Sequence, residues 1–187
     1  MRVFLETERI VLRRFTHADA NNLFELDSDP DVMRFINGGT PTPLDVVKNE
    51  DLPWFIEYGE RFPGYGFWAA EDKSSGEFLG WFLFRPPEDG SPDEPELGYR
   101  LRKSAWGKGY ATEGSYVLVR KGFAELGVPR VVAFALTGNK ASRRVMEKVG
   151  MALVRTFCHT WPDRFDGVEQ EIVEYALRKA DWEQQTS

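Results

Sequence analysis

A glycine-rich turn, AWGKGYATEG at residues 105–114, lies between a strand-like run and a segment of helical periodicity. The run ELGYRLR (96–102) precedes the turn, and from Gly109 to about Leu126 apolar residues follow helical spacing until Gly127 stops the helix. The first N–H groups of a helix lack intrahelical partners, and glycines let a ligand approach the backbone there. The order of strand, turn and helix therefore indicates a fold that mixes both element types, and it favours an anion site at the turn.

The flanking residues suggest which anion this turn would bind. Two known phosphate motifs fail: the dinucleotide fingerprint requires a third glycine where Thr112 stands, and the P-loop requires a glycine where Arg102 stands. A plain tight turn is the alternative. A polyphosphate ligand is favoured because four cations flank the turn: Arg100, Arg102, Lys103 and Lys108.

The remaining elements alternate in type along the chain. Strand character is strongest in seven runs: 9–15, 65–72, 77–85, 96–102, 129–136, 152–161 and 171–182. Helices are expected after Thr16, after Asp29 with Pro30, and after Thr42, the last broken or kinked by Pro53. Two more are expected over 109–126 and 139–150. This alternation of strands and helices, without internal repeat or linker, predicts one mixed α/β domain over residues 1–187.

Composition and charge exclude several classes of protein. A formal net charge of −6 argues against a nucleic-acid partner and suits a cationic substrate. A single cysteine, Cys158, forms no internal disulfide and favours a reducing compartment. The longest apolar stretch, Val131–Leu136, is too short to span a bilayer. We expect a soluble cytoplasmic protein without membrane association. Two histidines and one cysteine at no ligand spacing predict no metal site.

The glycine-rich turn resembles the cofactor motif of the GCN5-related N-acetyltransferases, Gln/Arg-x-x-Gly-x-Gly/Ala, with Trp106, Gly109 and Ala111 at its three positions. The branch of bacterial ribosomal-protein N-terminal acetyltransferases has the version Trp-Gly-x-Gly-Tyr-Ala-x-Glu, which residues 106–113 match at every fixed position. Four more segments resemble that branch in the same order: ETERIVLRRFTHADA with SDPDVMRFI, PELGYRL, NKASRRVMEKVGM and EYALRKADW.

The resemblance implies a mixed sheet of about seven strands whose fourth and fifth strands splay apart, flanked by helices, with acetyl-CoA between those two strands. The backbone at Tyr99, Leu101 and Lys103 would pair with the pantetheine arm. Asn139 would bond the pantetheine, unless it is only a helix cap. Ser142 belongs to the same cofactor set, and Arg143 with Arg144 would reach the 3′-phosphate. Amides of the turn would hold the pyrophosphate: Trp106, Gly107, Lys108, Gly109, Tyr110 and Ala111.

The implied reaction is direct attack of a neutral amine on the thioester in a ternary complex, with an amide near Leu101 stabilising the oxyanion. Many family members protonate the leaving thiolate from a tyrosine four residues before the helix-ending glycine, but Met146 stands there. Ser142 is therefore the candidate acid; the alternative is a serine that bonds locally. Glu96 is the candidate base, with Glu94 as its neighbour and a water relay as the alternative.

The acceptor is predicted only by class, as a protein N-terminus or a small cationic amine. The acidic loop, with Glu88, Asp89, Asp93, Glu94 and Glu96, motivates the cationic class. The wall of the acceptor pocket is expected at Trp54, Phe55, Tyr65 and Trp68, unless these pack in the core. A homodimer is compatible with the branch. The rival function is a non-catalytic acyl-CoA-binding sensor or scaffold on the same fold.

Overall fold

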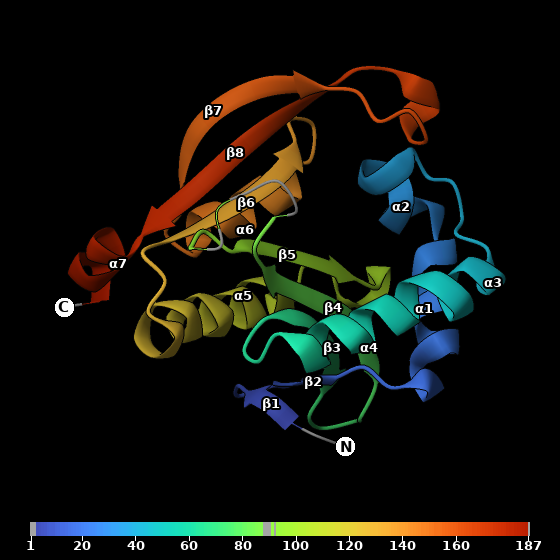
Figure 1. The fold of residues 1–187 in the computed structure, drawn as a ribbon, viewed down its shortest axis with the longest axis horizontal. Helices are drawn as coiled ribbons and strands as arrows, with labels where there is room; N and C mark the ends of the chain where they lie inside the picture. Colours follow the sequence, from blue (N-terminus) through green and yellow to red (C-terminus); the bar gives the residue numbers. More distant parts are fainter. Residues whose placement is uncertain (1–2, 88–90, 92, 187) are drawn as a thin grey trace.

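The computed structural model describes residues 3–87, 91 and 93–186 of this 187-residue chain. These residues form a sheet of eight strands in the order β1-β2-β3-β4-β5-β6-β8-β7, accompanied by helices (Figure 1). The strands are β1 (Val3–Glu6), β2 (Ile10–Arg14), β3 (Gly66–Asp72), β4 (Phe78–Arg85), β5 (Glu96–Leu101), β6 (Arg130–Leu136), β7 (Ala152–His159) and β8 (Gln170–Arg178). The α-helices are α1 (Ala20–Ser28), α2 (Pro30–Asn37), α3 (Leu44–Val46), α4 (Leu52–Arg61), α5 (Tyr110–Lys121), α6 (Lys140–Lys148) and α7 (Lys179–Thr186).

The mixed α/β class is confirmed, with two local corrections. The sheet has eight strands rather than about seven, because Val3–Glu6 pairs antiparallel with β2 and adds an edge strand. The last predicted strand ends early: β8 stops at Arg178, and residues 179–186 form α7. The apolar alternation ends there as well, since charged and amide side chains dominate that segment.

The helical segment around Pro53 changes its hydrogen-bonding pattern just before the proline. Between α3 and α4 the chain widens into one π-helical turn, Val47–Asp51, and Pro53 lies in the first turn of α4. Proline has no N–H and clashes with the preceding turn of a regular α-helix. A wider turn directly before Pro53 relieves both problems, so the helix continues where a break was predicted.

The fourth and fifth predicted strands, β5 and β6, splay apart as expected. Their parallel pairing is confined to Glu96 opposite Val132 in the described residues. Beyond that pair β6 turns away to join β8, with which it pairs along its whole length (Figure 1). β5 pairs with β4 along its full length instead. The strands therefore share one closed end, at Glu96, and diverge toward Leu101 and Leu136.

Two hydrophobic clusters pack on opposite faces of the sheet. The cluster on the α5/α6 face contains the largest fully buried side chains, among them Trp68, Phe82, Phe84 and Phe123. The cluster on the α1/α4 face joins α1, α2 and α4 to side chains from β3 and β4, such as Trp81. Full burial of an apolar side chain stabilises the fold by about 1.5–3 kcal/mol. Each face of the sheet therefore has its own apolar cluster, and β5 is a strand of the sheet between the two clusters.

Candidate functional site

The glycine-rich turn joins β5 to α5 through one 3₁₀ turn, Lys103–Ala105. Gly107 has a φ of 72° and Gly109 a φ of 85°, in the left-handed region that favours glycine. A Cβ at Gly107 would meet nothing within 4 Å, and one at Gly109 would meet only the Arg9 Nη2 atom, at 3.3 Å. The backbone conformation requires both glycines, and the space beside them remains open to a ligand.

The N-terminus of α5 differs from those of α2 and α6. Asp29 caps α2 and Asn139 caps α6 through side-chain oxygens, whereas Gly109 gives α5 no side-chain cap. The first helical bond of α5 joins the Glu113 amide to the Gly109 carbonyl, at 3.0 Å. The amides before that bond have no intrahelical acceptor, so they can bind an anion. They belong to Tyr110, Ala111 and Thr112.

Two predicted cofactor residues shape the turn with their side chains. The Trp106 indole Nε1 donates to the Leu101 carbonyl at 2.8 Å, which ties the turn back to β5. The Lys103 ammonium pairs with Asp31 of α2, and the Lys103 carbonyl accepts from the Trp106 amide at 3.1 Å. The Lys103 carbonyl is therefore committed to the turn.

Arg9, between β1 and β2, and Glu113, in the first turn of α5, hold the same glycine-rich turn. Glu113 accepts from the Arg9 amide at 2.9 Å, from Arg9 Nε at 2.7 Å and from the Thr7 hydroxyl at 2.5 Å. Arg9 Nη1 donates to the Lys108 carbonyl at 2.9 Å, and the guanidinium lies over the Tyr110 ring. Sequence reasoning missed Arg9. An available signal was Glu113, an acidic residue in the first turn of a helix whose N-terminus was predicted to bind an anion.

The edge of β5 that faces β6 fits an extended ligand. Arg102 donates its amide to the Leu79 carbonyl on β4, at 2.8 Å. Alternate residues of a strand point their backbone groups to opposite sides. Tyr99 and Leu101 therefore direct their N–H and C=O groups toward the diverging β6, and the Leu101 carbonyl is the one that accepts from the Trp106 indole.

Asn139, Ser142 and Tyr99 form a connected group beside this edge. The Ser142 amide donates to Asn139 Oδ1 at 3.1 Å. The Tyr99 hydroxyl lies 2.9 Å from both the Ser142 carbonyl and the Ser142 Oγ. Burial raises the pKa of Tyr99 to about 12, against a smaller opposing effect of the Ser142 hydrogen bond. Met146 is 1% exposed in the core, so it neither reaches a ligand nor donates a proton.

Arg143 is held in place rather than free in solvent. Its Nη1 donates to the Thr137 carbonyl at 3.2 Å, and its Nε donates to the Tyr175 hydroxyl at 3.3 Å. This phenol and Glu147 raise the pKa of Arg143. A hollow of about 440 Å³ is lined by Lys140, Arg143, Arg144 and Glu147.

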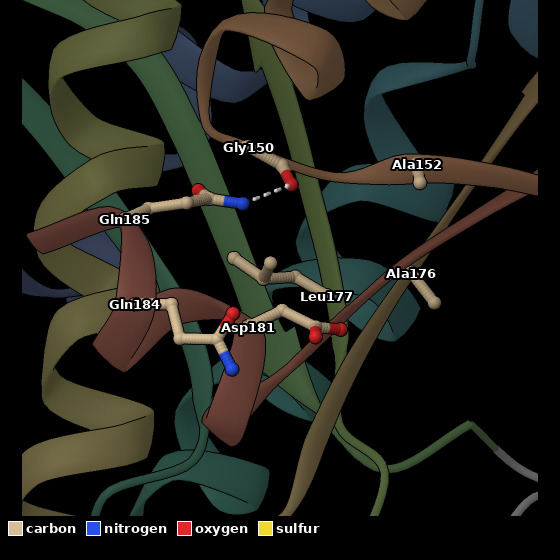
Figure 2. Close-up of a pocket in the computed structure, with 7 residues that line it drawn as sticks. All are labelled: Gly150, Ala152, Ala176, Leu177, Asp181, Gln184 and Gln185. Atoms are coloured by element: carbon tan, nitrogen blue, oxygen red, sulfur yellow. Dashed lines mark hydrogen bonds between the residues drawn. The ribbon is translucent and has the colours of Figure 1, made fainter.

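A second hollow, of about 360 Å³, lies where α7 meets the start of β7 and the end of β8 (Figure 2). The Gln185 amide donates to the Gly150 carbonyl across it, at 3.4 Å. Its lining residues include none of those predicted to bind cofactor or to act in catalysis.

Charged residues gather on the α1/α4 face of β5. Glu96 and Arg100 alternate with Tyr99, so they lie on the face opposite Ser142. Arg100 bonds Asp27 of α1 at 2.7 Å. Burial raises the pKa of Asp27 against the opposing pull of Arg100, and burial with the nearby Asp27 charge raises the pKa of Asp51. This face of β5 therefore carries carboxylates that hold protons more readily than usual.

The acidic loop is described only in part, and the aromatic wall differs from expectation. Glu88 and Asp89 lie outside the described residues, and Glu94 forms an ion pair with Arg130 at 2.7 Å. The aromatic wall prediction is wrong for Trp68, which is 0% exposed and stacks on Phe4 on the α5/α6 face.

The other predicted wall residues divide between core and surface. Phe55 stacks on Phe67 inside the α1/α4 cluster, and Tyr65 stacks on Phe84. Trp54 stays 40% exposed.

The described residues contain neither a metal-binding cluster nor a membrane-spanning helix. Within residues 3–87, 91 and 93–186, no cluster of three or more His, Cys, Asp or Glu side chains could hold a metal ion. In the same part of the chain, no helix is long and apolar enough to cross a membrane.

The model of the acetyltransferase (GNAT) domain matches residues 9–152. The chain belongs to the GNAT acetyltransferase family. It is 33% identical over 184 residues to the FsC-acetyl coenzyme A-N(2)-transacetylase of Aspergillus fumigatus, an alignment covering 95% of this chain and 77% of that relative. The predicted resemblance and the enzyme class are thereby confirmed.

Solved GNAT structures share this fold. The GNAT-family acetyltransferase of Bacillus anthracis aligns with a TM-score of 0.78 at 24% identity, covering 96% of this chain and 99% of the other. The RimL ribosomal L7/L12 α-N-protein acetyltransferase in complex with coenzyme A aligns with a TM-score of 0.75 at 17% identity, covering 95% and 98%. Acetyl-CoA is the donor that the GNAT family uses, and the open glycine turn and the free edge of β5 fit that group.

Proposed function

We propose that this GNAT enzyme moves an acetyl group from acetyl-CoA directly to a primary amine of a cationic acceptor, within a ternary complex and in a domain spanning residues 1–187. The observation that carries the proposal is the uncapped N-terminus of α5. Its amides follow two left-handed glycines and lie beside the diverging edge of β5. An anion and an extended, amide-containing arm can be bound there together.

The cofactor contacts follow from this geometry. The amides from Trp106 to Ala111 hold the pyrophosphate, and backbone groups of Tyr99 and Leu101 pair with the pantetheine. Asn139 already caps α6 and presents its amide nitrogen to the same arm. Arg143 and Arg144 line a hollow that suits the 3′-phosphate. Bound acetyl-CoA supplies the activated thioester.

The chemical roles are divided between the two faces of β5. Ser142, on the α5/α6 face, donates a proton to the leaving thiolate. Glu96, on the α1/α4 face, accepts the proton of the attacking ammonium. The Leu101 amide, at the edge between the faces, donates to the oxyanion. Donor and acceptor thus approach the reaction centre from opposite sides of the sheet.

The cationic class of the acceptor is supported by the charges around Arg100. Asp51 adds a carboxyl group near the Arg100–Asp27 ion pair on this side of β5, and the whole chain carries a net charge of −6. The name of the Aspergillus fumigatus relative states transfer from acetyl coenzyme A to an N(2) nitrogen, which supports an amine acceptor. A cytoplasmic location, supported by the single cysteine, and a homodimer remain predictions.

The test is acetyl-CoA turnover, measured as released thiol, against peptides with different N-termini, polyamines, aminoglycosides and uncharged amines. We expect cationic amines to have the highest kcat/KM and to lose that advantage as salt is raised, because screening shortens the reach of the carboxylates. Ser142→Ala should lower kcat while the dissociation constant for acetyl-CoA is retained. Preference for uncharged amines at low salt would contradict the acceptor class. Tight binding of CoA without turnover of any acceptor would contradict the catalytic proposal.

A further inference from the structure

Tyr99 crosses from the sheet to the helix that carries the candidate acid. It lies on β5 with its side chain on the α5/α6 face, where its ring contacts Phe82. Its hydroxyl reaches the first turn of α6 and lies 2.9 Å from two atoms of Ser142, the backbone carbonyl oxygen and Oγ. A buried phenol and a serine hydroxyl are thus joined between elements 43 residues apart in sequence.

The chemistry of the donors limits the direction of these two bonds. A carbonyl oxygen only accepts, whereas either hydroxyl can donate in the contact between Tyr99 and Ser142 Oγ. For Ser142 to give its own proton to the thiolate, the Tyr99 hydroxyl must donate to Ser142 Oγ in the reactive arrangement. A serine hydroxyl otherwise rotates to suit its surroundings. Because Asn139 also binds the Ser142 amide, both the backbone and the side chain of Ser142 are held.

We propose that Tyr99 is a positioning residue for the acetyl transfer: its hydroxyl fixes the Oγ of Ser142 at the β5–α6 junction, where the leaving thiolate is protonated. This inference rests on the proposed role of Ser142. It assigns to the side chain of Tyr99 a function separate from the backbone pairing of the same residue with the pantetheine. It also supplies the site with a phenol from β5. In this chain Met146 occupies the α6 position at which many family members have a tyrosine.

Tyr99 acts through Ser142 and does not itself give up a proton. Burial raises its pKa to about 12, well above the ordinary value for tyrosine. At neutral pH it therefore stays protonated throughout the reaction cycle. Its contribution is to donate a hydrogen bond to Ser142 Oγ, which leaves the serine proton directed toward the thiolate and stabilises the serine oxygen as that proton leaves.

The decisive experiment is a double-mutant cycle with Tyr99→Phe, Ser142→Ala and the double variant, measured as kcat, KM and the dissociation constant for acetyl-CoA. We expect Ser142→Ala to lower kcat about 100-fold, as loss of a general acid does. Tyr99→Phe should lower kcat about tenfold, with KM and the dissociation constant within about twofold of wild type. In the double variant, Tyr99→Phe should add nothing to Ser142→Ala.

Tyr58→Phe is the matched control. Tyr58 is a partly buried tyrosine on α4, on the face of the sheet opposite Ser142, and its hydroxyl interacts with Arg85. Its loss should leave kcat within about twofold of wild type. Thermal melting of all variants reports whether each is folded.

A second measurement keeps the inference testable if Tyr99→Phe fails to fold. Replacing Tyr99 with 3,5-difluorotyrosine retains both hydrogen bonds and lowers the phenol pKa. For a positioning residue, kcat changes by no more than about threefold and its pH profile does not move. A shifted pH profile would overturn positioning and make Tyr99 a proton donor.

The remaining outcomes separate this inference from the proposed function. If the losses of kcat in Tyr99→Phe and Ser142→Ala multiply in the double variant, Tyr99 acts independently of Ser142. That result overturns this inference and leaves the proposed function standing. An unchanged kcat in Tyr99→Phe would do the same. An unchanged kcat in Ser142→Ala would overturn both the acid role and the inference built on it.

Discussion

The two faces of β5 differ in the chemical groups that form the site. On the α5/α6 face, the site consists mainly of backbone: two left-handed glycines, an uncapped helix N-terminus and an open strand edge. On the α1/α4 face, it consists of side-chain ion pairs such as Arg100 with Asp27, and the same face of the sheet carries the pair of Arg13 with Asp19 at β2. A binding site made of backbone groups depends on which local residues are glycine. An ion pair depends on which elements, distant in sequence, pack against each other.

This difference predicts which substitutions affect which property. Changes on the α1/α4 face should first lower stability, because buried charges lose their partners. Changes to the glycine-rich turn on the α5/α6 face should first lower cofactor affinity, because the fold is held there by an independent apolar cluster. Four experiments test this difference between the two faces.

Arg13→Met should have the largest effect on stability. The Arg13 side chain is 6% exposed, binds both oxygens of Asp19 at 2.7 and 2.8 Å, and binds Glu71 at 2.6 Å. Removing it leaves two carboxylates without their cation, which costs about 3–5 kcal/mol in the free energy of unfolding. Urea unfolding measures this loss.

Lys73→Met is the control for Arg13→Met. Lys73 forms an exposed pair with Glu6 at 2.9 Å, so its loss costs about 1 kcal/mol or less. The acetyl-CoA affinity of folded Arg13→Met should equal that of wild type. Equal unfolding free energies for the two variants would contradict the contrast between the faces.

The stability of wild type should fall between pH 10 and 12 relative to Tyr99→Phe. The folded pKa of Tyr99 is about 12, above the ordinary value near 10. The unfolded chain therefore ionises first, so this stabilisation is complete below pH 10 and is lost as pH rises through 12. Over that interval the difference amounts to about 2–3 kcal/mol. Urea unfolding of both proteins near each end measures it, and parallel curves would show that Tyr99 is less buried than described.

Gly109→Ala should weaken acetyl-CoA binding while acetyl-pantetheine, which lacks the pyrophosphate, binds as before. An L side chain at a φ of 85° costs about 1–2 kcal/mol, and the displaced turn should lower affinity about tenfold. Isothermal titration with both ligands measures this.

Gly76→Ala is the matched control, because Gly76 has a φ of 72° with open space around it, in the β3–β4 hairpin. It should cost similar stability without any loss of affinity. Equal losses for both ligands in Gly109→Ala would indicate a general distortion of the site.

Glu113→Gln should have the smallest effect, about a threefold loss of acetyl-CoA affinity, because a carboxamide retains only one accepting oxygen toward Thr7 and Arg9. The contacts with Thr7 and Arg9 lower the pKa of Glu113 against burial. Its stabilising contribution is therefore present above the ordinary pKa range of glutamate and is lost as pH falls.

Glu125→Gln, at an exposed position paired with Lys121, is the control for Glu113→Gln. An unchanged affinity in Glu113→Gln would show that Arg9 alone holds the turn.

Local patterns predicted the elements well because their determinants are local. Asp29 with Pro30 at the start of α2, Asn139 at the start of α6, and Gly127 after residue 126 all mark boundaries where they were expected. The edge strand β1 was missed because four residues without strict alternation give little signal. Helix α7 was missed because an apolar strand leads directly into it.

The same distinction between local and long-range determinants applies to the candidate site. Motif spacing predicted Gly107, Gly109 and Asn139, since a left-handed turn and a helix cap restrict residue type directly. No spacing could predict that Tyr99 reaches Ser142 or that Arg9 supports the turn. Those contacts join residues 43 and about 100 positions apart, and each side chain has many alternative partners in the unfolded chain.

The sequence by itself determined the family, the element order and the backbone cradle, because glycine positions, helix caps and apolar periodicity act within a few residues. Tertiary structure decided which polar side chains face each other across β5. It placed Tyr99 against Ser142 on one face and Arg100 against Asp27 on the other. A strand sends successive side chains to opposite faces, but only the packing of α1 and α6 against those faces selects their partners.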